Sequence, residues 1–474
     1  MADQFDAIVV GSGPNGLAAA ILLQQKGLKT VIYEQADTPG GAVRTINSTL
    51  PGFYHDFGSA IHPLAFDSPF FKTLPLEDYG LKWVHPPIPF AHPFTDGDAY
   101  ACFTSIEDTA NQLGQDRKRY IDLYKKLLND WEVIDKNILG PFVLPQHPFR
   151  MARFGLKALM PASFFADKFF KEERTRLLFY GAAAHSTLPL TNLATASFGM
   201  VLNILAHKTG WPFPQGGAGK LSEALINYYI HLGGELILNQ RVIDIQDLPL
   251  SKVYLFDITP RQLLNIKGTN FSTGYRNRLS KYNYGAGVFK IDWALSHPIP
   301  FKNEKCRKAG TVHLGYSMNE IENSEAVIHK GEFTDKPYVL VVQHSVFDIT
   351  RAPAGKHTGW AYCHVPHGST VDMTEYIENQ IEIAAPGFRD CIIERVTYNT
   401  HQLEASNPNL VGGDINGGRQ DITQLFTRPV ARISPYTTSN SRIYICSSST
   451  PPGGGVHGMS GYHAADRAWK DHFK

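Results

Sequence analysis

The feature that most constrains this chain is a glycine-rich turn between two apolar segments near the N-terminus. Residues 7–10 are a short run of Ala, Ile and Val, which predicts a buried parallel strand. The pattern Gly-x-Gly-x-x-Gly occupies 11–16, and residues 17–23 continue as an apolar helical segment. A second predicted strand over 29–34 ends with an acid. This order of strand, turn, helix, strand and acid predicts a Rossmann-type unit that binds a dinucleotide.

Each part of this unit has a physical task in holding a dinucleotide. Gly11 permits a tight turn, Gly13 lets the backbone approach a pyrophosphate, and Gly16 lets the helix pack on the strand. The amino end of the helix offers free N–H groups and a partial positive charge to the pyrophosphate. Glu34 would accept hydrogen bonds from a ribose diol. Three neighbouring residues complete the predicted contacts: Pro14, Asn15 and Gln35.

Two further motifs indicate that the dinucleotide is FAD. Residues 40–45 read Gly-Gly-Ala-Val-Arg-Thr, and residues 52–59 read Gly-Phe-Tyr-His-Asp-Phe-Gly-Ser. Both stretches resemble those of the FAD-binding amine oxidase and carotene desaturase superfamily. Arg44 could then neutralise the pyrophosphate from the side opposite the helix; the alternative is a glycine turn with a surface arginine. The resemblance also assigns four small residues to cofactor binding: Gly40, Gly41, Gly58 and Ser59.

The C-terminal segment is similar to the flavin motif of the carotene desaturase branch. A predicted strand over 442–446 leads into the glycine-rich loop 447–459 and then into a helix. In that family the loop runs beside the isoalloxazine ring, and the amino end of the helix faces its pyrimidine side. A helix dipole there would stabilise the negative charge of a reduced flavin. The resemblance therefore implies five cofactor contacts: Gly455, Val456, His457, Gly458 and Met459.

A third segment completes the predicted flavin domain. Residues 211–221 contain the family's Gly-Gly-x-Gly-x-Leu element, followed by a helix and a strand over 235–238. The resemblance implies that Val242 meets the adenine through backbone groups. The segment 252–260 looks like the strand by which the family's chain leaves the FAD domain.

The resemblance spans nearly the whole chain and predicts an α/β fold with two discontinuous domains. A length of 474 residues corresponds to roughly three units of about 150 residues, or two larger ones. We expect a Rossmann-type FAD-binding domain with a parallel sheet, built from 1–70, 211–265 and 436–474. We expect a mixed sheet-and-helix substrate domain over 71–210 and 266–435.

The most specific resemblance is to the phytoene desaturase-like group that includes pyridine nucleotide-disulphide oxidoreductase domain-containing protein 2. It is carried by residues 412–418 and 448–458. It implies an FAD-dependent oxidoreductase that oxidises or desaturates a largely apolar small molecule by hydride transfer to flavin N5, with oxygen or a quinone as acceptor. Two alternatives stay open: a non-enzymatic lipid- or prenyl-binding protein on the same scaffold, and a flavin amine oxidase.

Three residues are candidates for chemistry beside the flavin. Lys290, in a predicted strand over 284–293, resembles the amine oxidase lysine that reaches flavin N5 through a water; the alternative is a lysine that extends from a strand edge. His457 lies in the flavin loop and could hydrogen-bond the ring or a substrate; the alternative is that it braces the loop. His62 flanks the turn at 56–58.

Composition disfavours several other classes. The 45 Lys and Arg against 44 Asp and Glu give a formal net charge of +1. The chain therefore lacks the excess of positive charge that is typical of proteins that bind nucleic acids. The five scattered cysteines fit neither a disulfide framework nor a zinc spacing, so we predict no metal site and a reducing compartment. The start of the chain, with Asp3 and Asp6, is acidic where a secretion signal would be basic, and we expect a cytoplasmic protein.

One amphipathic segment predicts a peripheral contact with a membrane. From 149 to 160, basic residues recur at i, i+3 and i+7, and apolar residues recur similarly on another face. This pattern is typical of a helix that lies on an anionic membrane, which suits a lipophilic substrate. The alternative is a docking helix with a solvated basic face. The longest uncharged run, 177–207, contains polar groups that are costly in lipid, and predicts a buried pair of helices.

Overall fold

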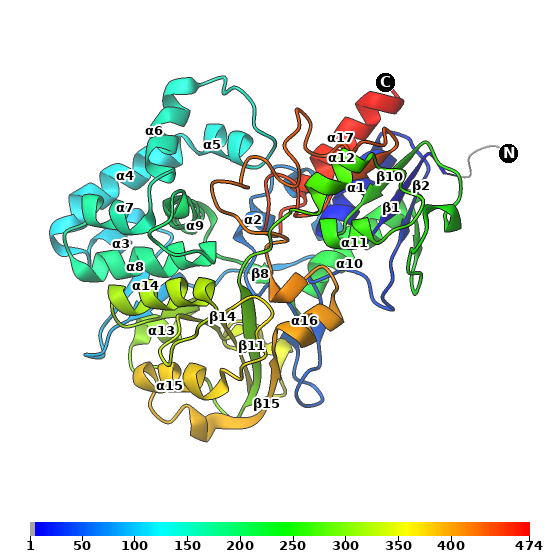
Figure 1. The fold of residues 1–474 in the computed structure, drawn as a ribbon. Helices are drawn as coiled ribbons and strands as arrows, with labels where there is room; N and C mark the ends of the chain where they lie inside the picture. The colour runs from blue at the N-terminus through cyan, green and yellow to red at the C-terminus, as the bar shows by residue number, and fades with distance from the viewer. Residues whose placement is uncertain (1–4) are drawn as a thin grey trace.

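Two β-sheets organise the chain, and they lie on opposite sides of a central region that loops and helices cross (Figure 1). The computed structural model describes residues 5–474, so the prediction drawn from Asp3 lies outside the described residues. One sheet has the strand order β16-β10-β1-β2-β9, and the other has the order β15-β11-β14-β13-β12-β6-β7. This mixed α/β arrangement confirms the predicted fold class.

The five-stranded sheet is parallel throughout and collects its strands from three distant segments. β1 (Ala7–Val10) and β2 (Thr30–Tyr33) come from the N-terminal part of the chain. β9 (Glu235–Ile237) and β10 (Val253–Phe256) come from its middle, and β16 (Ile443–Ile445) comes from near its end. The central strand pairs with β2 on one side and β10 on the other, and all four of its residues are buried. Such apolar runs are typical of parallel strands that are covered on both faces.

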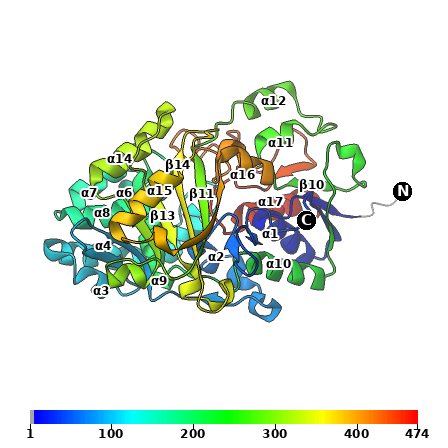
Figure 2. The same cartoon turned by 90° about the horizontal axis from the view of Figure 1, so that it is seen from below.

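Helices cover both faces of this sheet, as the view from below also shows (Figure 2). α1 (Pro14–Gln25), α10 (Gly219–His231) and α17 (Met459–His472) share one core cluster with alternate residues of the strands. α11 (Pro260–Leu264) and α12 (Thr273–Leu279) contribute to the cluster on the other face. The core of this half of the molecule therefore lies between helices and sheet.

The seven-stranded sheet is mixed, and within the described residues its only parallel pair is β6 with β12. Its strands are β6 (Ile88–Pro93), β7 (Ala99–Cys102), β11 (Gly287–Leu295), β12 (Ala309–Leu314), β13 (Val339–Val342), β14 (His357–Val365) and β15 (Ile392–Tyr398). Short strands pair elsewhere: β3 (Thr45–Ile46) with β4 (His55–Asp56), and β5 (Trp83–Val84) with β8 (Phe213–Pro214).

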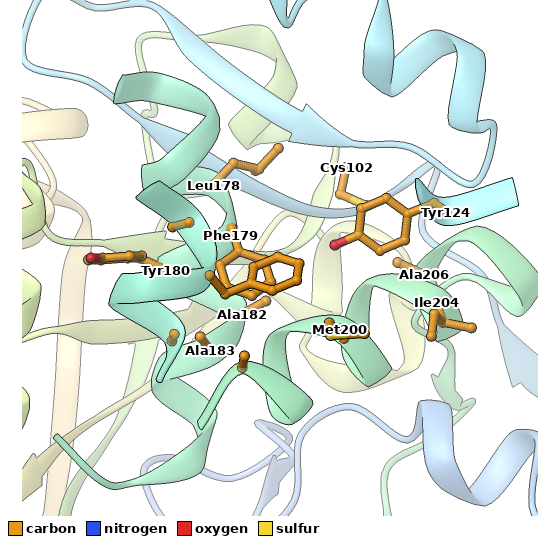
Figure 3. Packing of buried hydrophobic residues seen from close by; sticks show 14 of the residues in the cluster. Cys102, Tyr124, Leu178, Phe179, Tyr180, Ala182, Ala183, Met200, Ile204 and Ala206 are labelled. Atoms are coloured by element: carbon orange, nitrogen blue, oxygen red, sulfur yellow. The ribbon is translucent and has the colours of Figure 1, made fainter. Parts of the chain in front are cut away.

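A group of helices packs beside the seven-stranded sheet around a core rich in aromatic side chains. Phe179 and Tyr180 of α8 and Met200 of α9 lie in this core together with Tyr124 of α4 (Figure 3). These helices are α3 (Ile106–Ala110), α4 (Arg117–Asn129), α5 (Trp131–Ile138), α6 (Pro148–Ala158), α7 (Ala162–Phe169), α8 (Glu173–Ala183) and α9 (Thr195–Thr209). The two buried helices predicted over 177–207 are confirmed as α8 and α9. Between residues 5 and 474, no helix is both long and apolar enough to cross a membrane.

The remaining helices are short or lie at the edges of the second sheet. They are α2 (Pro63–Phe66), α13 (Glu304–Arg307), α14 (Met318–Val327), α15 (Thr374–Ala384) and α16 (Thr400–Ser406). The predicted domain boundaries stay a prediction. Phe71 and Leu76, just beyond the predicted boundary at residue 70, have their side chains in the core cluster of the first sheet.

A buried carboxylate connects the two halves of the molecule. Asp56 Oδ1 accepts hydrogen bonds from the Ala218 backbone N–H at 2.7 Å and the Thr45 hydroxyl at 3.1 Å. Its Oδ2 lies 2.9 Å from Nη2 of Arg351, which is fully buried in the segment between β13 and β14. Burial alone would raise the pKa of Asp56, but the positive charge of Arg351 and the Ala218 hydrogen bond hold it at about 2. Asp56 is therefore ionised at neutral pH and anchors the turn 57–59 to the second sheet.

Removing this carboxylate should destabilise the whole chain. We expect D56A to lower the free energy of unfolding by about 3–5 kcal/mol, because Arg351 would keep a buried charge without a partner. The folded pKa of about 2 lies below the unfolded value of about 3.9, so the contribution of Asp56 is present above about pH 4 and is lost as the pH falls towards 2. Urea unfolding at neutral and acidic pH measures both effects. E304A, at an exposed pair with Lys308, is the control and should leave the midpoint unchanged; equal losses in the two variants would contradict this account.

Candidate active site

A single cavity of about 850 Å³ runs between the two sheets. Its wall includes Val10 and Tyr33 at the carboxyl ends of β1 and β2, where parallel sheets of this kind bind ligands. The same wall includes β11 and β14 of the second sheet, helices α6 and α9, and the C-terminal glycine-rich loop. Segments from the whole length of the chain therefore meet around one space.

Most of the site residues predicted from the sequence line this cavity. They are Gly11, Gly13, Pro14, Asn15, Glu34, Gln35, Gly41, Arg44, Gly58, Ser59, His62, Val242, Lys290, Gly455, Val456 and His457. Four predicted residues, Gly16, Gly40, Gly458 and Met459, do not line it and lie behind the wall. A Cβ at Gly16 would lie 2.1 Å from the Gly11 carbonyl oxygen, so this glycine lets α1 approach β1 as expected.

The glycine-rich turn and Arg44 present polar atoms that the protein leaves unpaired. Gly13, Pro14 and Asn15 bring the amino end of α1 to the cavity. The Asn15 side-chain oxygen and the Arg44 Nε are buried without a hydrogen-bond partner among the described residues. The Arg44 guanidinium stacks 4.7 Å from the centre of the Phe57 ring, which fixes it at the wall. Free N–H groups, a helix dipole and a cation at one end of the cavity suit an anionic phosphate group.

Glu34 lies directly after β2, and its carboxylate is already held in place. Oε2 accepts hydrogen bonds from the backbone N–H and the hydroxyl of Ser12, at 2.9 and 2.7 Å. Oε1 accepts one from the Ala36 backbone N–H at 2.9 Å. A carboxylate has about four acceptor directions, so one remains on Oε1 at the cavity wall. This geometry fits a hydrogen bond from one ribose hydroxyl.

Asp257 is a site residue that the sequence analysis did not identify. It follows β10, lines the cavity, and its Oδ2 accepts a hydrogen bond from the Gly16 N–H at 2.9 Å. A Cβ at Gly13 would lie 2.6 Å from the same oxygen, so the carboxyl group stands against the glycine-rich turn. Burial raises the pKa of Asp257 well above its ordinary value. This shift favours the protonated carboxyl, which does not repel a phosphate. The only signal for Asp257 in the sequence was an acid after an apolar strand.

Lys290 is buried in an interior strand of the second sheet, so the interpretation of a lysine that extends from a strand edge is wrong. β11 lies between β14 and β15, and Lys290 is 2% exposed. Its Nζ lies 2.6 Å from Oδ2 of Asp292, which also accepts a hydrogen bond from the Ser48 hydroxyl. Burial lowers the pKa of Lys290, and the charge of Asp292 opposes that shift. The structure therefore holds an ion pair beside the cavity.

The two candidate histidines are both neutral and both have a structural partner. Burial lowers the pKa of His457 and of His62 to about 4. His457 Nδ1 accepts a hydrogen bond from the Met459 N–H at 3.0 Å, so its proton lies on Nε2, which has no partner. His62 Nε2 lies 2.9 Å from the Ser59 hydroxyl. His457 thus braces the loop with one nitrogen and keeps a free N–H donor on the other.

The other half of the cavity is apolar. α6 contributes Met151 and Phe154, and α9 contributes Phe198, Val201 and Leu202. The exposed rings of Phe142 and Phe426, 6.2 Å apart, lie at its border with solvent. Over residues 5–474, no cluster of His, Cys, Asp and Glu side chains is arranged to hold a metal ion. The cavity therefore joins a polar, phosphate-compatible end to an apolar chamber.

Comparison with known proteins relates the chain to oxidoreductases. Residues 9–74 match the family model of the NAD(P)-binding Rossmann-like domain. The chain is 24% identical to pyridine nucleotide-disulfide oxidoreductase domain-containing protein 2 of Rattus norvegicus, over 99% of this chain and 94% of that protein. It is 25% identical to phytoene desaturase (lycopene-forming) of Pantoea ananas, over 96% of each chain. These relatives confirm the predicted resemblance and the prediction of an oxidoreductase.

A solved structure shares the fold along the whole chain. An oxidoreductase from Methanosarcina mazei matches with a TM-score of 0.67 at 15% identity, covering 97% of this chain and 99% of that one. At this level of identity the likeness concerns the fold alone.

The raised pKa of Asp257 makes stability depend on pH. The unfolded chain loses this proton above about pH 4, whereas the folded chain keeps it, so stability falls by up to about 1.4 kcal/mol per pH unit. Asparagine cannot ionise and can still accept the Gly16 hydrogen bond. We therefore expect D257N to gain stability relative to the wild type as the pH rises above about 4, the range in which the unfolded chain ionises. Urea unfolding across that range measures the gain, with D37N at an exposed carboxylate as control; a difference that does not change with pH would contradict the assignment.

Proposed function

We propose that this chain is an FAD-dependent oxidoreductase that oxidises or desaturates a largely apolar small molecule. The observation that carries the proposal is the continuous cavity, which joins the glycine-rich turn to the apolar chamber between α6 and α9. Binding of a dinucleotide at one end and an apolar molecule at the other would bring both against the same loop, 455–457. Relatives named phytoene desaturases support this assignment.

The polar end fits the parts of FAD one by one. The amino end of α1 and the free Nε of Arg44 would hold the pyrophosphate, and Oε1 of Glu34 would accept a ribose hydroxyl. Val242, at the same wall, would lie against the adenine. The loop 455–457 would flank the isoalloxazine ring. When bound, FAD supplies the electron acceptor, N5, for the hydride that leaves a C–H bond of the substrate, with oxygen or a quinone as the final acceptor.

The chain's own residues would orient the substrate, place charges near the flavin and exclude water. Lys290, held by Asp292, keeps a cation in the buried wall, and His457 presents its Nε2–H. The amino end of α17 begins directly after the loop and adds a partial positive charge. Such preorganised donors stabilise negative charge far better in a dry site than in water. The apolar chamber excludes water from the reacting bond.

The polar end also separates this proposal from its main alternative. A protein that only holds a lipid or prenyl group has no use for a phosphate-compatible turn, a fixed ribose acceptor and a buried Lys290–Asp292 pair around one space. A flavin amine oxidase shares these features and differs only in its substrate, so substrate trials decide between the two. The anaerobic loss of flavin colour on mixing with lipid extracts or with amines is the direct test.

Loss of the Glu34 carboxylate should weaken FAD binding. We expect purified wild-type protein to carry FAD, with its visible absorption band, and E34A to bind it about 10-fold or more weakly, because a charge-assisted hydrogen bond contributes about 1.5–3 kcal/mol. Titration of apoprotein with FAD, followed by flavin fluorescence, measures the affinity. D37A, at an exposed acid three residues further on, is the matched control and should bind like the wild type. Colourless wild-type protein that fails to bind added FAD would overturn the proposal.

We further infer that α6 brings the mouth of the cavity to a lipid surface. One side of α6 lines the apolar chamber through Phe154, whereas Phe149 is 88% exposed and Leu156 is 72% exposed. Arg150 and Arg153 lie 3.6 and 3.4 Å from the carboxylate of Asp130, so their charge is partly balanced within the protein. Insertion of apolar side chains, more than charge, would therefore drive the contact.

Vesicle binding tests this contact. We expect F149S/L156S to bind phosphatidylcholine vesicles that contain phosphatidylserine at least about 10-fold more weakly than the wild type, since burying each side chain is worth about 1.5–3 kcal/mol. Co-sedimentation at low and high salt measures the binding, and the wild type should keep most of it at high salt. F333S, at an exposed phenylalanine beside Tyr376, is the control. Equal binding by the wild type and both variants would contradict the inference that α6 contacts a membrane.

A further inference from the structure

Two histidines, the fully buried His313 and the half-buried His185, form a pair in the wall of the substrate half of the cavity. His185 lies in a short 3-10 helix (Ala184–Ser186) after α8 and lines the cavity. Its Nε2 lies 3.0 Å from Nε2 of His313 on β12, and the two rings are nearly perpendicular. A hydrogen bond between the two nitrogens requires one hydrogen between them. The position of that hydrogen decides what His185 offers to the cavity.

Both rings are neutral. Burial lowers the pKa of His185 to about 3 and that of His313 well below its ordinary value. A neutral imidazole carries one N–H and one bare nitrogen, so each ring has a single donor. The pair therefore holds two N–H groups, of which only one can lie in the bond between the rings.

The surroundings of His313 determine the arrangement. Its Nδ1 is buried without a hydrogen-bond partner among the described residues, and a Cβ built at Gly181 would lie 2.7 Å from it. A buried N–H without a partner is rarer and more costly than a bare acceptor nitrogen. His313 therefore keeps its hydrogen on Nε2 and donates it to Nε2 of His185. The hydrogen of His185 must then lie on Nδ1.

The Nδ1–H of His185 has no acceptor within residues 5–474, and the ring is only partly covered. The cavity that it lines also has apolar side chains of α9 in its wall, among them Phe198, Val201 and Leu202. The indole ring of Trp211 packs 5.7 Å from the imidazole and holds it in place. A fixed donor in an apolar wall carries a desolvation penalty unless a ligand accepts its hydrogen bond.

A chain of contacts connects the segment of this donor with the loop assigned to the flavin. The Thr187 hydroxyl, two residues after His185, accepts a hydrogen bond from Nδ2 of Asn416 at 3.2 Å. Asn416 in turn touches the C-terminal loop, because a Cβ at Gly454 would lie 2.6 Å from its Oδ1. A substrate group bound by His185 would therefore lie near the reacting part of the cavity.

We propose that His185 binds an oxygen of the substrate, so that the substrate is an apolar molecule with a carbonyl or hydroxyl group rather than a plain hydrocarbon. This inference rests on the proposed function, since it takes the apolar chamber as the substrate site. His313 acts as a positioning residue, because its hydrogen bond directs the N–H of His185 into the cavity.

A matched pair of ligands tests the proposal. 2-Undecanone and dodecane have the same number of heavy atoms, and the ketone has a carbonyl oxygen in place of one carbon of the alkane. We expect H185F to bind the ketone about 10-fold more weakly than the wild type and to bind the alkane equally well. H185N, which keeps an N–H donor, should recover part of the loss, and H401F, at an exposed histidine, is the control. Quenching of tryptophan fluorescence, to which Trp211 contributes, measures the affinities.

The wild-type protein gives a second measurement that needs no variant. Its preference for the ketone over the alkane should exceed the preference expected from their partition between water and octanol. A wild-type preference that follows partition, or an H185F variant that weakens both ligands equally, would overturn the inference. Flavin content is measured in the same samples, so yellow protein without ketone preference rejects only this inference. Colourless protein with ketone preference rejects only the assignment of FAD.

Discussion

The ion pair between Asp56 and Arg351 holds the first sheet's half of the molecule against the second. The cavity lies between these two halves and depends on this arrangement. Besides Arg351, the Asp56 carboxylate binds the start of α10 through Ala218, and its backbone oxygen accepts a hydrogen bond from the Trp360 indole. One residue thus connects the first sheet's helices with two segments of the second half. Because both charges are fully buried, any relative shift would leave them unpaired in an apolar interior. The residues that follow, Gly58 and Ser59, are held at the cavity wall as a result.

The two ends of the cavity differ in electrostatic character. Helices α1 and α17 both begin at or next to the cavity, so their amino ends add positive potential near the polar part of the wall. Burial disfavours the charged forms of other titratable groups at the same wall, such as His457 and Asp257. The side chains that stay charged at the site are those paired with an opposite charge of the same chain, such as Lys290 with Asp292. A small set of fixed donors therefore faces a mostly uncharged chamber.

The sequence predicted best those features that local physical demands impose. A glycine-rich turn between a buried strand and a helix has few other uses, and it led to the parallel sheet and to Glu34. Lys290 was found, and its partner could have been found too, because residues two apart in a strand lie on one face. The pair of His185 and His313 could not have been found from the sequence, because it depends on a helix end that meets β12. The position of β12 is set by tertiary packing through its parallel pairing with β6. Asp257 was missed because its surroundings, the turn 11–16, follow the neighbouring strand β1 and are distant in sequence.

The order of strands in the parallel sheet also has a consequence for how the protein is made. β16 and α17 come from residues 443–474, far along the chain from β1, and they complete both the sheet and the glycine-rich loop. A nascent chain can form β1, β2 and α1 early, since domains fold progressively during synthesis. It nonetheless lacks one wall of the cavity until residues 443–474 have been synthesised. A polypeptide truncated before residue 443 could therefore form β1, β2 and α1 but could not enclose the cavity.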